Sequence, residues 1–165
     1  MKILVVYDSA FGNTEKVARA IAAALNHAEV LHVDQVKPEA FAGLDCLVVG
    51  APTQKMNYTD GMRDFLASIP PDKIRGLRIA AFDTRISIDD VKSKLERFAA
   101  RLFLHRYAAK PIAAALVEKG GLEVIEAEGF FVLDTEGPLK DGELERAAAW
   151  ARQILQQVAA QPERH

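Results

Sequence analysis

The amino-acid sequence predicts an α/β fold in which a doubly wound, five-stranded parallel sheet carries helices on both faces. Short runs that are apolar at every position alternate along the chain with longer segments whose apolar residues recur at helical spacing. A strand without a polar face must be buried on both sides, which is typical of a parallel sheet between two helix layers. The length of 165 residues, half of them hydrophobic, suits one core. We therefore expect residues 1–165 to form a single domain.

The strand candidates are short, apolar and rich in β-branched residues. The first follows the initiator methionine and lysine directly, and the last is expected in two halves interrupted at Gly129. In chain order the expected strands cover residues 3–7, 30–33, 44–49, 77–82, and 122–125 with 130–133.

The helix candidates repeat apolar residues every three or four positions. They are expected at residues 14–25, 60–69, 88–103, 108–119 and 143–158. Pro70 and Pro71 should end the second helix, since proline cannot continue a helix, and Asp141 is a plausible N-cap of the last one. The segment 87–105 is longer than a minimal crossover connection needs, so we expect it to carry an extra helix.

Charge and composition exclude several classes of protein. The net charge of −2 and the pI near 6.1 show no basic excess that would favour nucleic acid or an anionic membrane. No apolar run approaches the roughly 20 residues of a membrane span, and the N-terminal run is too short for a signal peptide. The lone Cys46 cannot form an internal disulfide. We therefore expect a cytoplasmic protein with no nucleic-acid partner and no membrane span.

The loop after the first strand is the most informative stretch of the sequence. Ligands of open α/β sheets bind beyond the carboxyl ends of the strands, and this loop leads from a buried strand directly into a helix. Its glycine lets the backbone approach an anion closely, and the free N–H groups at the helix start lie at the positive end of the helix dipole. The candidate phosphate-binding residues are Ser9, Ala10, Phe11, Gly12, Asn13 and Thr14. The alternative is that the loop is only a turn and a helix cap.

Residues 7–18, Tyr-Asp-Ser-Ala-Phe-Gly-Asn-Thr-Glu-Lys-Val-Ala, resemble the phosphate-loop signature of the flavodoxin family. The likeness continues through residues 49–54, 129–132, 136–139 and 142–147 and so covers nearly the whole chain. The resemblance implies a sheet with strand order 2-1-3-4-5 and FMN as the cofactor. Phe11 stands where the family often has a hydroxyl residue, so one phosphate contact is expected to be missing.

The resemblance also implies which residues face the flavin ring. These are Pro52, Thr53, Gln54, Lys55, Met56, Asn57 and Tyr58 after the third strand, and Asp83, Thr84 and Arg85 after the fourth. Tyr58 is the candidate for ring stacking and Met56 for a polarizable contact; alternatively, Met56 packs in the core and Tyr58 covers the following helix. The family commonly has a tyrosine after the fourth strand, and none is present here.

Two residues could compensate for that missing tyrosine. Arg85 either lies along the flavin edge, where it attracts the negative side of a reduced ring, or pairs with Asp83 or Asp89. Tyr107 either folds back as the missing aromatic residue or packs in the core.

The function that the resemblance implies is low-potential electron transfer to a redox partner protein or a small redox substrate. FMN would supply the redox chemistry, and the weak net charge would give little long-range steering toward a partner. One alternative is an FMN-dependent reductase of a quinone or a porphyrinogen-type substrate. Another is a binding module that has kept the fold and lost FMN. Whether the protein is an enzyme therefore stays open.

The residues that a receiver domain, a hydrolase or a metal site would need are missing from the sequence. A receiver domain needs a phosphate-accepting aspartate after the third strand, where this chain has Gly50-Ala51-Pro52. A hydrolase using Asp8-Ser9 needs a later Asp-x-x-His pair, which no histidine of this chain provides. His27 and His32 flank the second strand and are expected away from the ligand edge. No cluster has metal-ligand spacing, so we expect no metal.

The second flavin loop generates a prediction about the redox states of the cofactor. In flavodoxins, a peptide that can flip, helped by glycine, stabilises the one-electron-reduced flavin, and residues 55–58 contain no glycine. Asn57 is the residue there that best tolerates a positive φ. We expect this chain to stabilise the one-electron-reduced flavin less than typical flavodoxins do. Abundant blue species in a photoreduction series followed by absorption would refute this.

Overall fold

The computed structural model describes residues 1–55, 57–87, 93–102 and 107–161. Its centre is a six-stranded sheet in which every pair of neighbouring strands is parallel. The strands are β1 (Ile3–Tyr7), β2 (Glu29–His32), β3 (Cys46–Pro52), β4 (Arg78–Ile86), β5 (Leu122–Glu123) and β6 (Glu128–Val132). The order is β2-β1-β3-β4-β5, and β6 also pairs with β4. The predicted α/β class and the strand order 2-1-3-4-5 are confirmed.

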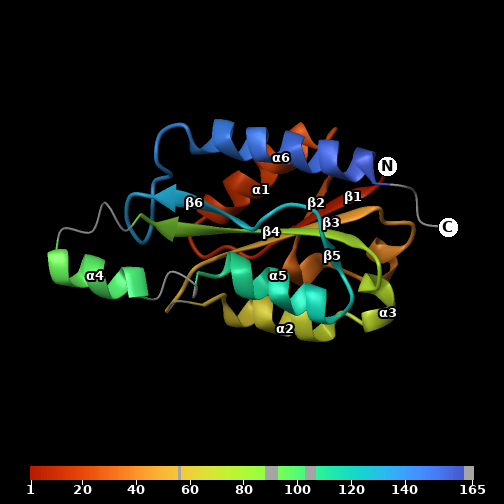
Figure 1. Cartoon of the computed structure of the whole chain (residues 1–165), viewed down its shortest axis with the longest axis horizontal. Coiled ribbons are helices and arrows are strands. Elements are labelled where there is room, and N and C mark those ends of the chain that lie inside the picture. Colours follow the sequence, from red (N-terminus) through yellow and green to blue (C-terminus); the bar gives the residue numbers. More distant parts are fainter. Residues whose placement is uncertain (56, 88–92, 103–106, 162–165) are drawn as a thin grey trace.

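Helices cover both faces of this sheet, as predicted (Figure 1). On one face lie α1 (Asn13–Ala24) and α6 (Glu143–Ala160), and on the other lie α2 (Asp60–Ser68) and α5 (Ala109–Glu118). A short helix, α3 (Pro71–Ile74), follows α2, and two single turns of 3₁₀ helix, Val33–Gln35 and Pro38–Phe41, lead from β2 toward β3.

The two helix layers enclose two separate cores. In β1, Leu4 and Val6 belong to the cluster beneath α2 and α5, whereas Val5 faces the cluster beneath α1 and α6. All five residues of β1 are buried. The strand is therefore apolar at every position because each face meets its own core.

An aromatic cluster fills the layer between the sheet and α6. The rings of Phe82, Phe130 and Trp150 meet edge to face, with centroids 6.1–6.4 Å apart. The ring of Phe82 lies directly over Gly50, where a Cβ atom would overlap it. Gly50 is thus required by this close approach, in a strand that is otherwise built from larger residues.

The fifth strand is split, as predicted, but at a different place. Both halves pair with β4, and the break covers residues 124–127. Gly129, expected at the interruption, instead lies inside β6, with Asp83 as its register partner.

Two helix boundaries also correct the prediction. Gly142 (φ 84°), and not Asp141, is the N-cap of α6. Pro71 does not merely end a helix but begins α3, because the missing N–H of a proline costs nothing in the first turn.

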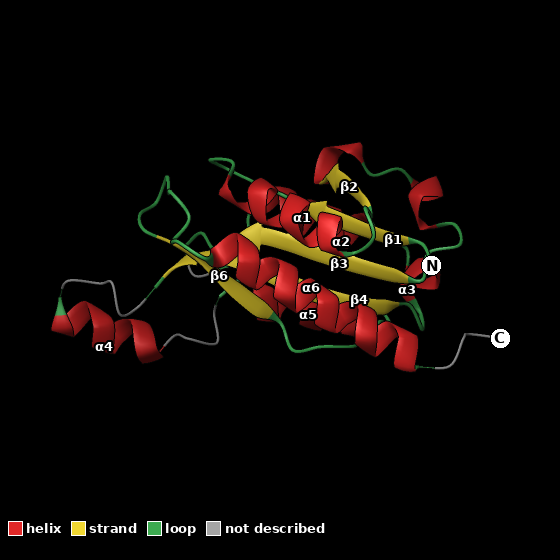
Figure 2. Ribbon diagram, turned by 90° about the horizontal axis from the view of Figure 1, so that it is seen from above, coloured by secondary structure: helices red, strands yellow, loops and turns green. Residues whose placement is uncertain are grey.

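The extra helix expected within residues 87–105 is present as α4 (Lys94–Leu102), shorter than the predicted 88–103. Residues 88–92 and 103 of that prediction lie outside the described residues. Figures 1 and 2 show α4 beyond the ends of β4 and β6, apart from the two helix layers. Leu95 and Phe98 of its apolar stripe are 78% and 64% exposed.

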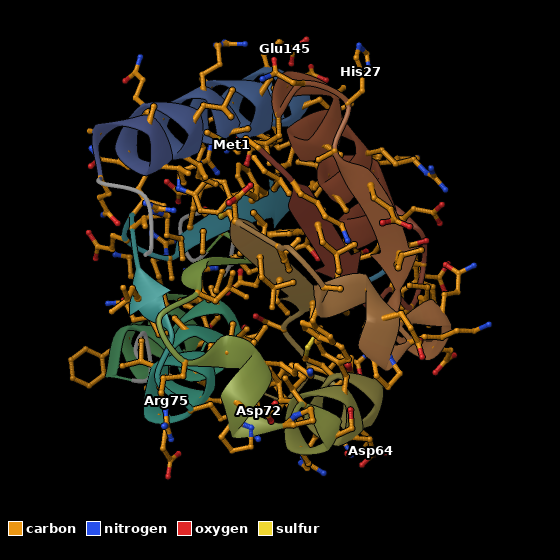
Figure 3. All side chains as sticks on the ribbon, turned by 90° about the vertical axis from the view of Figure 1, so that its right-hand side faces the viewer. Met1, His27, Asp64, Asp72, Arg75 and Glu145 are labelled. Carbon is orange, nitrogen blue, oxygen red and sulfur yellow. The ribbon has the colours of Figure 1, made fainter. Side chains whose placement is uncertain are left out.

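Several charged side chains lie on the outside of the layers (Figure 3). Figure 3 shows Asp64, Asp72, Arg75 and Glu145 pointing away from the sheet. Among the described residues, no helix is long and apolar enough to cross a membrane.

The buried carboxylate of Glu143 joins β6 to the first turn of α6. It accepts hydrogen bonds from the Phe131 N–H (2.7 Å) and the Arg146 guanidinium (2.6 and 3.0 Å). Burial opposes its ionisation, but these donors outweigh burial and lower the pKa of Glu143 below its ordinary 4.5.

We expect Glu143→Gln to lower the free energy of unfolding at pH 7 by about 1–3 kcal/mol, because the charge-assisted bonds are lost. A carboxylate whose pKa is lowered on folding contributes stability above its unfolded pKa, and that contribution is lost as pH falls through the folded value. Denaturant unfolding of the wild type and of Glu143→Gln from pH 7 down to pH 3 should therefore show that the difference in their free energies of unfolding narrows below about pH 4.5. Glu145→Gln, in the same turn but exposed, is the matched control; an equal effect there would contradict this role for Glu143.

Candidate functional site

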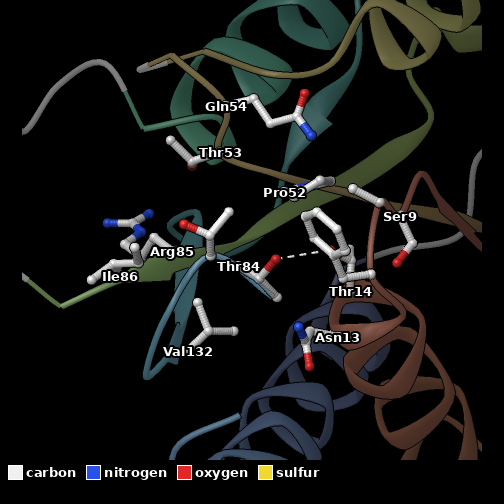
Figure 4. A pocket seen from close by; sticks show the side chains of 13 residues that line it. Ser9, Asn13, Thr14, Pro52, Thr53, Gln54, Thr84, Arg85, Ile86 and Val132 are labelled. Carbon is white, nitrogen blue, oxygen red and sulfur yellow. Dashed lines mark hydrogen bonds between the residues drawn. The ribbon is translucent and has the colours of Figure 1, made fainter. Parts of the chain in front are cut away.

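A pocket opens where β1, β3 and β4 end and α1 begins (Figure 4). Its volume is about 110 Å³, well below the roughly 300–1,000 Å³ of pockets that enclose a whole small ligand. It therefore fits a compact group, with any larger part of a ligand lying at its mouth. The lining residues are Ser9, Ala10, Phe11, Asn13, Thr14, Pro52, Thr53, Gln54, Thr84, Arg85, Ile86, Val132 and Thr135.

The backbone at the start of α1 forms one wall of this pocket. Gly12 caps the helix in the left-handed region (φ 88°), and its N–H donates to Ser9 Oγ (3.0 Å). In the described part of the chain, the N–H groups of Ala10, Phe11, Asn13 and Thr14 have no hydrogen-bond acceptor. These unpaired donors lie at the positive end of the helix dipole and suit an anion.

Two side chains of the predicted phosphate loop are engaged elsewhere. Asn13 Nδ2 donates to the Glu136 carbonyl (3.0 Å) and so holds the loop after β6 against α1. The hydroxyls of Thr14 and Thr84 share a buried hydrogen bond of 2.8 Å, drawn dashed in Figure 4. In such a pair one hydroxyl donates and the other keeps its hydrogen for a further acceptor.

The loop is also held from beneath by Asp8. Its carboxylate accepts from the Ser9 N–H (2.8 Å), from the hydroxyl of Thr59, and from His32 Nε2 at 3.1 Å. His32 Nδ1 accepts from the Asp34 N–H, which leaves the proton of a neutral ring on Nε2, where it donates to Asp8.

The expectation that His32 lies away from the ligand edge is wrong. His32 is the last residue of β2, in register with Tyr7, and parallel strands end at the same edge. It supports the phosphate loop through Asp8 and does not line the pocket.

Thr84 and Arg85 line the opposite wall, with Asp83 behind them; all three lie within β4 and not after it as predicted. Arg85 Nε and Nη2 each donate to Asp83 at 2.6 Å, which realises the predicted pairing with Asp83. Burial raises the pKa of Asp83, and the Arg85 guanidinium and the Ala109 N–H oppose that rise. Asp83 is fully buried behind the pocket, whereas Arg85 lines it.

Only the first part of the segment 52–58 reaches the pocket. Pro52, Thr53 and Gln54 line it; beyond them Gln54 and Asn57 pair through two backbone hydrogen bonds of 2.8 and 2.9 Å. Among the described residues of this turn, Lys55 has a positive φ (47°), whereas Asn57, the residue that would best tolerate one, does not. Met56 lies outside the described residues.

Of the two predictions for Tyr58, the structure supports packing and not a place in this pocket. Tyr58 packs against the core beneath α2 and α5 and lines a separate groove with Leu66 and Ala115. The structure does not bring Tyr58, Lys55 or Asn57 into the pocket lining.

Three lining residues were missed from the sequence: Ile86, Val132 and Thr135. They lie at the ends of β4 and β6 and in the loop after β6. A signal was available, because that loop also follows the carboxyl end of a parallel strand. No group of three or more His, Cys, Asp or Glu that could hold a metal occurs within the described residues.

Comparisons with known proteins identify the family and support the fold. Residues 4–99 match the family model described as a flavodoxin domain. The fold is similar to a flavodoxin from the domain Archaea (TM-score 0.73, 21% identity, covering 96% of this chain and 99% of that one) and to oxidised flavodoxin 1 of Bacillus cereus (0.70, 20%, 94% and 98%). It is also similar to rubredoxin oxygen:oxidoreductase from Desulfovibrio gigas (0.71, 17%), where it covers 96% of this chain and 36% of that one. A search of curated proteins gives no match.

The Thr14–Thr84 bond can be tested as a pair. Thr14→Val or Thr84→Val leaves one buried hydroxyl without its partner, so we expect each to cost about 1–3 kcal/mol of unfolding free energy. The double variant removes both hydroxyls and should cost less than the sum of the single variants. Urea unfolding of the four proteins measures this; strict additivity would show that the two threonines are not coupled.

Proposed function

Since the chain belongs to the flavodoxin domain family, we propose that it binds FMN in this pocket and carries electrons at low potential between redox partners. The observation that carries the proposal is the set of unpaired N–H groups at the start of α1, which face a pocket at the carboxyl edge of the sheet. The solved flavodoxin structures support the fold, and the residues that line the pocket support FMN as the cofactor.

The residues present fit the phosphate end of FMN. The doubly negative phosphate would accept from the amides of Ala10, Phe11, Asn13 and Thr14 without needing a lysine or arginine, because the helix dipole favours an anion there. The Ser9 hydroxyl still has its hydrogen to donate, since it only accepts from Gly12. Asn13 and Thr14 would act mainly by holding the loop.

The remaining lining residues fit a planar, largely apolar ring. Pro52, Ile86 and Val132 offer apolar walls, and Phe11 is 53% exposed at the rim. Such walls exclude water from a bound ring and disfavour charge on it. When bound, FMN supplies the electron transfer, while the protein fixes its position and its electrostatic surroundings.

One observation favours a second candidate, an FMN-dependent reductase of a quinone or porphyrinogen-type substrate. Two apolar side chains that line the pocket stay exposed: Phe11 at 53% and Ile86 at 38%. An apolar rim suits a flat apolar substrate better than a strongly charged protein partner. Multiple turnovers of a quinone with NAD(P)H would assign the reductase, and transfer only to a protein acceptor would assign the carrier.

Gly12 gives the sharpest test of FMN binding. We expect wild-type protein to bind FMN with quenching of flavin fluorescence and to bind riboflavin, which lacks the phosphate, much more weakly. Gly12→Leu places a side chain at a positive φ beside the phosphate loop and should abolish this preference for FMN, with an unchanged far-UV spectrum.

The matched control is Gly142→Leu. Gly142 caps α6 with nearly the same backbone angles (φ 84°, ψ −4°) as Gly12 (φ 88°, ψ −5°), and a Cβ atom meets nothing within 4 Å at either position. Gly142→Leu should lower the free energy of unfolding by about as much as Gly12→Leu does, and it should leave FMN affinity unchanged. Unchanged FMN affinity in Gly12→Leu would overturn the placement of the phosphate, and no binding by wild-type protein would favour a module that has lost FMN.

A further inference from the structure

Among the described residues that line the pocket, Arg85 is the one that carries a charge. Its side chain is 17% exposed, whereas its partner Asp83 is completely buried. The two are joined by parallel hydrogen bonds of 2.6 Å, the bidentate geometry that fixes a guanidinium in its plane. The pair is therefore oriented, with its positive end toward the pocket.

The guanidinium is held on its flat faces as well. The ring of Tyr107 lies over it, with 3.9 Å from the guanidinium carbon to the ring centroid. A Cβ atom at Gly129 of β6 would overlap the guanidinium, so the missing side chain of Gly129 makes room for it. Of the five N–H donors of Arg85, two bond Asp83, and the others have no acceptor among the described residues.

We propose that Arg85 is a second anion-binding group of the pocket, separate from the phosphate loop, and that it favours the reduced, negatively charged ring of FMN over the neutral oxidised ring. This rests on the proposed function. Two electrons from a reductant and one proton from water convert the neutral ring into a singly charged anion. Arg85 pairs with that new charge, and no bond in the protein is made or broken.

Although Arg85 is paired with Asp83, the two together favour a negative charge in the pocket. A cation that lines the pocket acts on a charge in the pocket more strongly than a counter-ion buried behind it, because Coulomb energy falls with distance. The two hydrogen bonds to Asp83 and the ring of Tyr107 hold Arg85 in this orientation, so the charge is in place before the flavin is reduced.

The test compares the dissociation constants of oxidised FMN and of FMN reduced with dithionite. Arg85→Gln alone leaves Asp83 buried without its partner and risks unfolding, so the main comparison is Asp83→Asn against the double variant Asp83→Asn/Arg85→Gln. These two proteins share a neutral residue 83 and differ only in the cation. We expect the double variant to lose about tenfold or more in preference for reduced FMN, a shift of about 30 mV to lower potential for a two-electron couple. Arg85→Lys in the wild-type background should keep most of the preference.

Riboflavin identifies which anion Arg85 serves. If Arg85 acts on the ring, the loss of preference for the reduced form is the same with riboflavin, which has no phosphate. Equal weakening of oxidised and reduced FMN, or an effect that vanishes with riboflavin, would overturn the proposal. If wild-type protein binds oxidised FMN but the double variant keeps the same preference for reduced FMN as Asp83→Asn, this inference alone is overturned. If wild-type protein binds no FMN, the proposed function is overturned as well.

Discussion

A parallel sheet that is buried on both faces leaves one place for polar chemistry, the edge where its strands end. The interior strands of this protein are apolar at nearly every position because each face meets a helix layer. All of them run the same way, so their carboxyl ends meet at one edge together with the start of α1. The unpaired amides of α1, the hydroxyl of Thr84 and the guanidinium of Arg85 gather there as a consequence of strand direction, without a separate folding device.

Much of the polar chemistry near this edge holds the binding loop and does not face the ligand. Asn13 ties α1 to the loop after β6, Thr14 ties it to β4, and Asp8 ties the preceding turn to His32 and Thr59. A loop fixed from three directions presents its amides in one arrangement before any anion arrives. Such preorganisation lowers the ordering cost of binding and is a general requirement of precise sites.

Most of the fold could be predicted from the sequence, because the apolar runs and the helical spacing are local signals. The site could be predicted only in part, since the remaining features depend on contacts between distant residues. Residues 83–85 were expected after a strand ending at Phe82, yet β4 continues through them to Ile86, with Asp83 and Arg85 paired to each other. Gly129 was expected to break a strand, and it serves instead to admit Arg85 from the neighbouring strand. Nothing local to Tyr58 distinguishes ring stacking from packing beneath α2, and His32 reaches Asp8 only through the pairing of β1 with β2.

The aromatic cluster beneath α6 makes one layer of the molecule optically distinct. Trp150 is the only tryptophan of the chain, and it is nearly fully buried against Phe82 and Phe130. Indole emission therefore originates from the layer of α1 and α6, while the core beneath α2 and α5 contributes none. Detachment of α6 would shift that emission to longer wavelength even if the other layer kept its packing, so an emission shift that precedes loss of the far-UV signal marks loosening of this layer before the sheet unfolds.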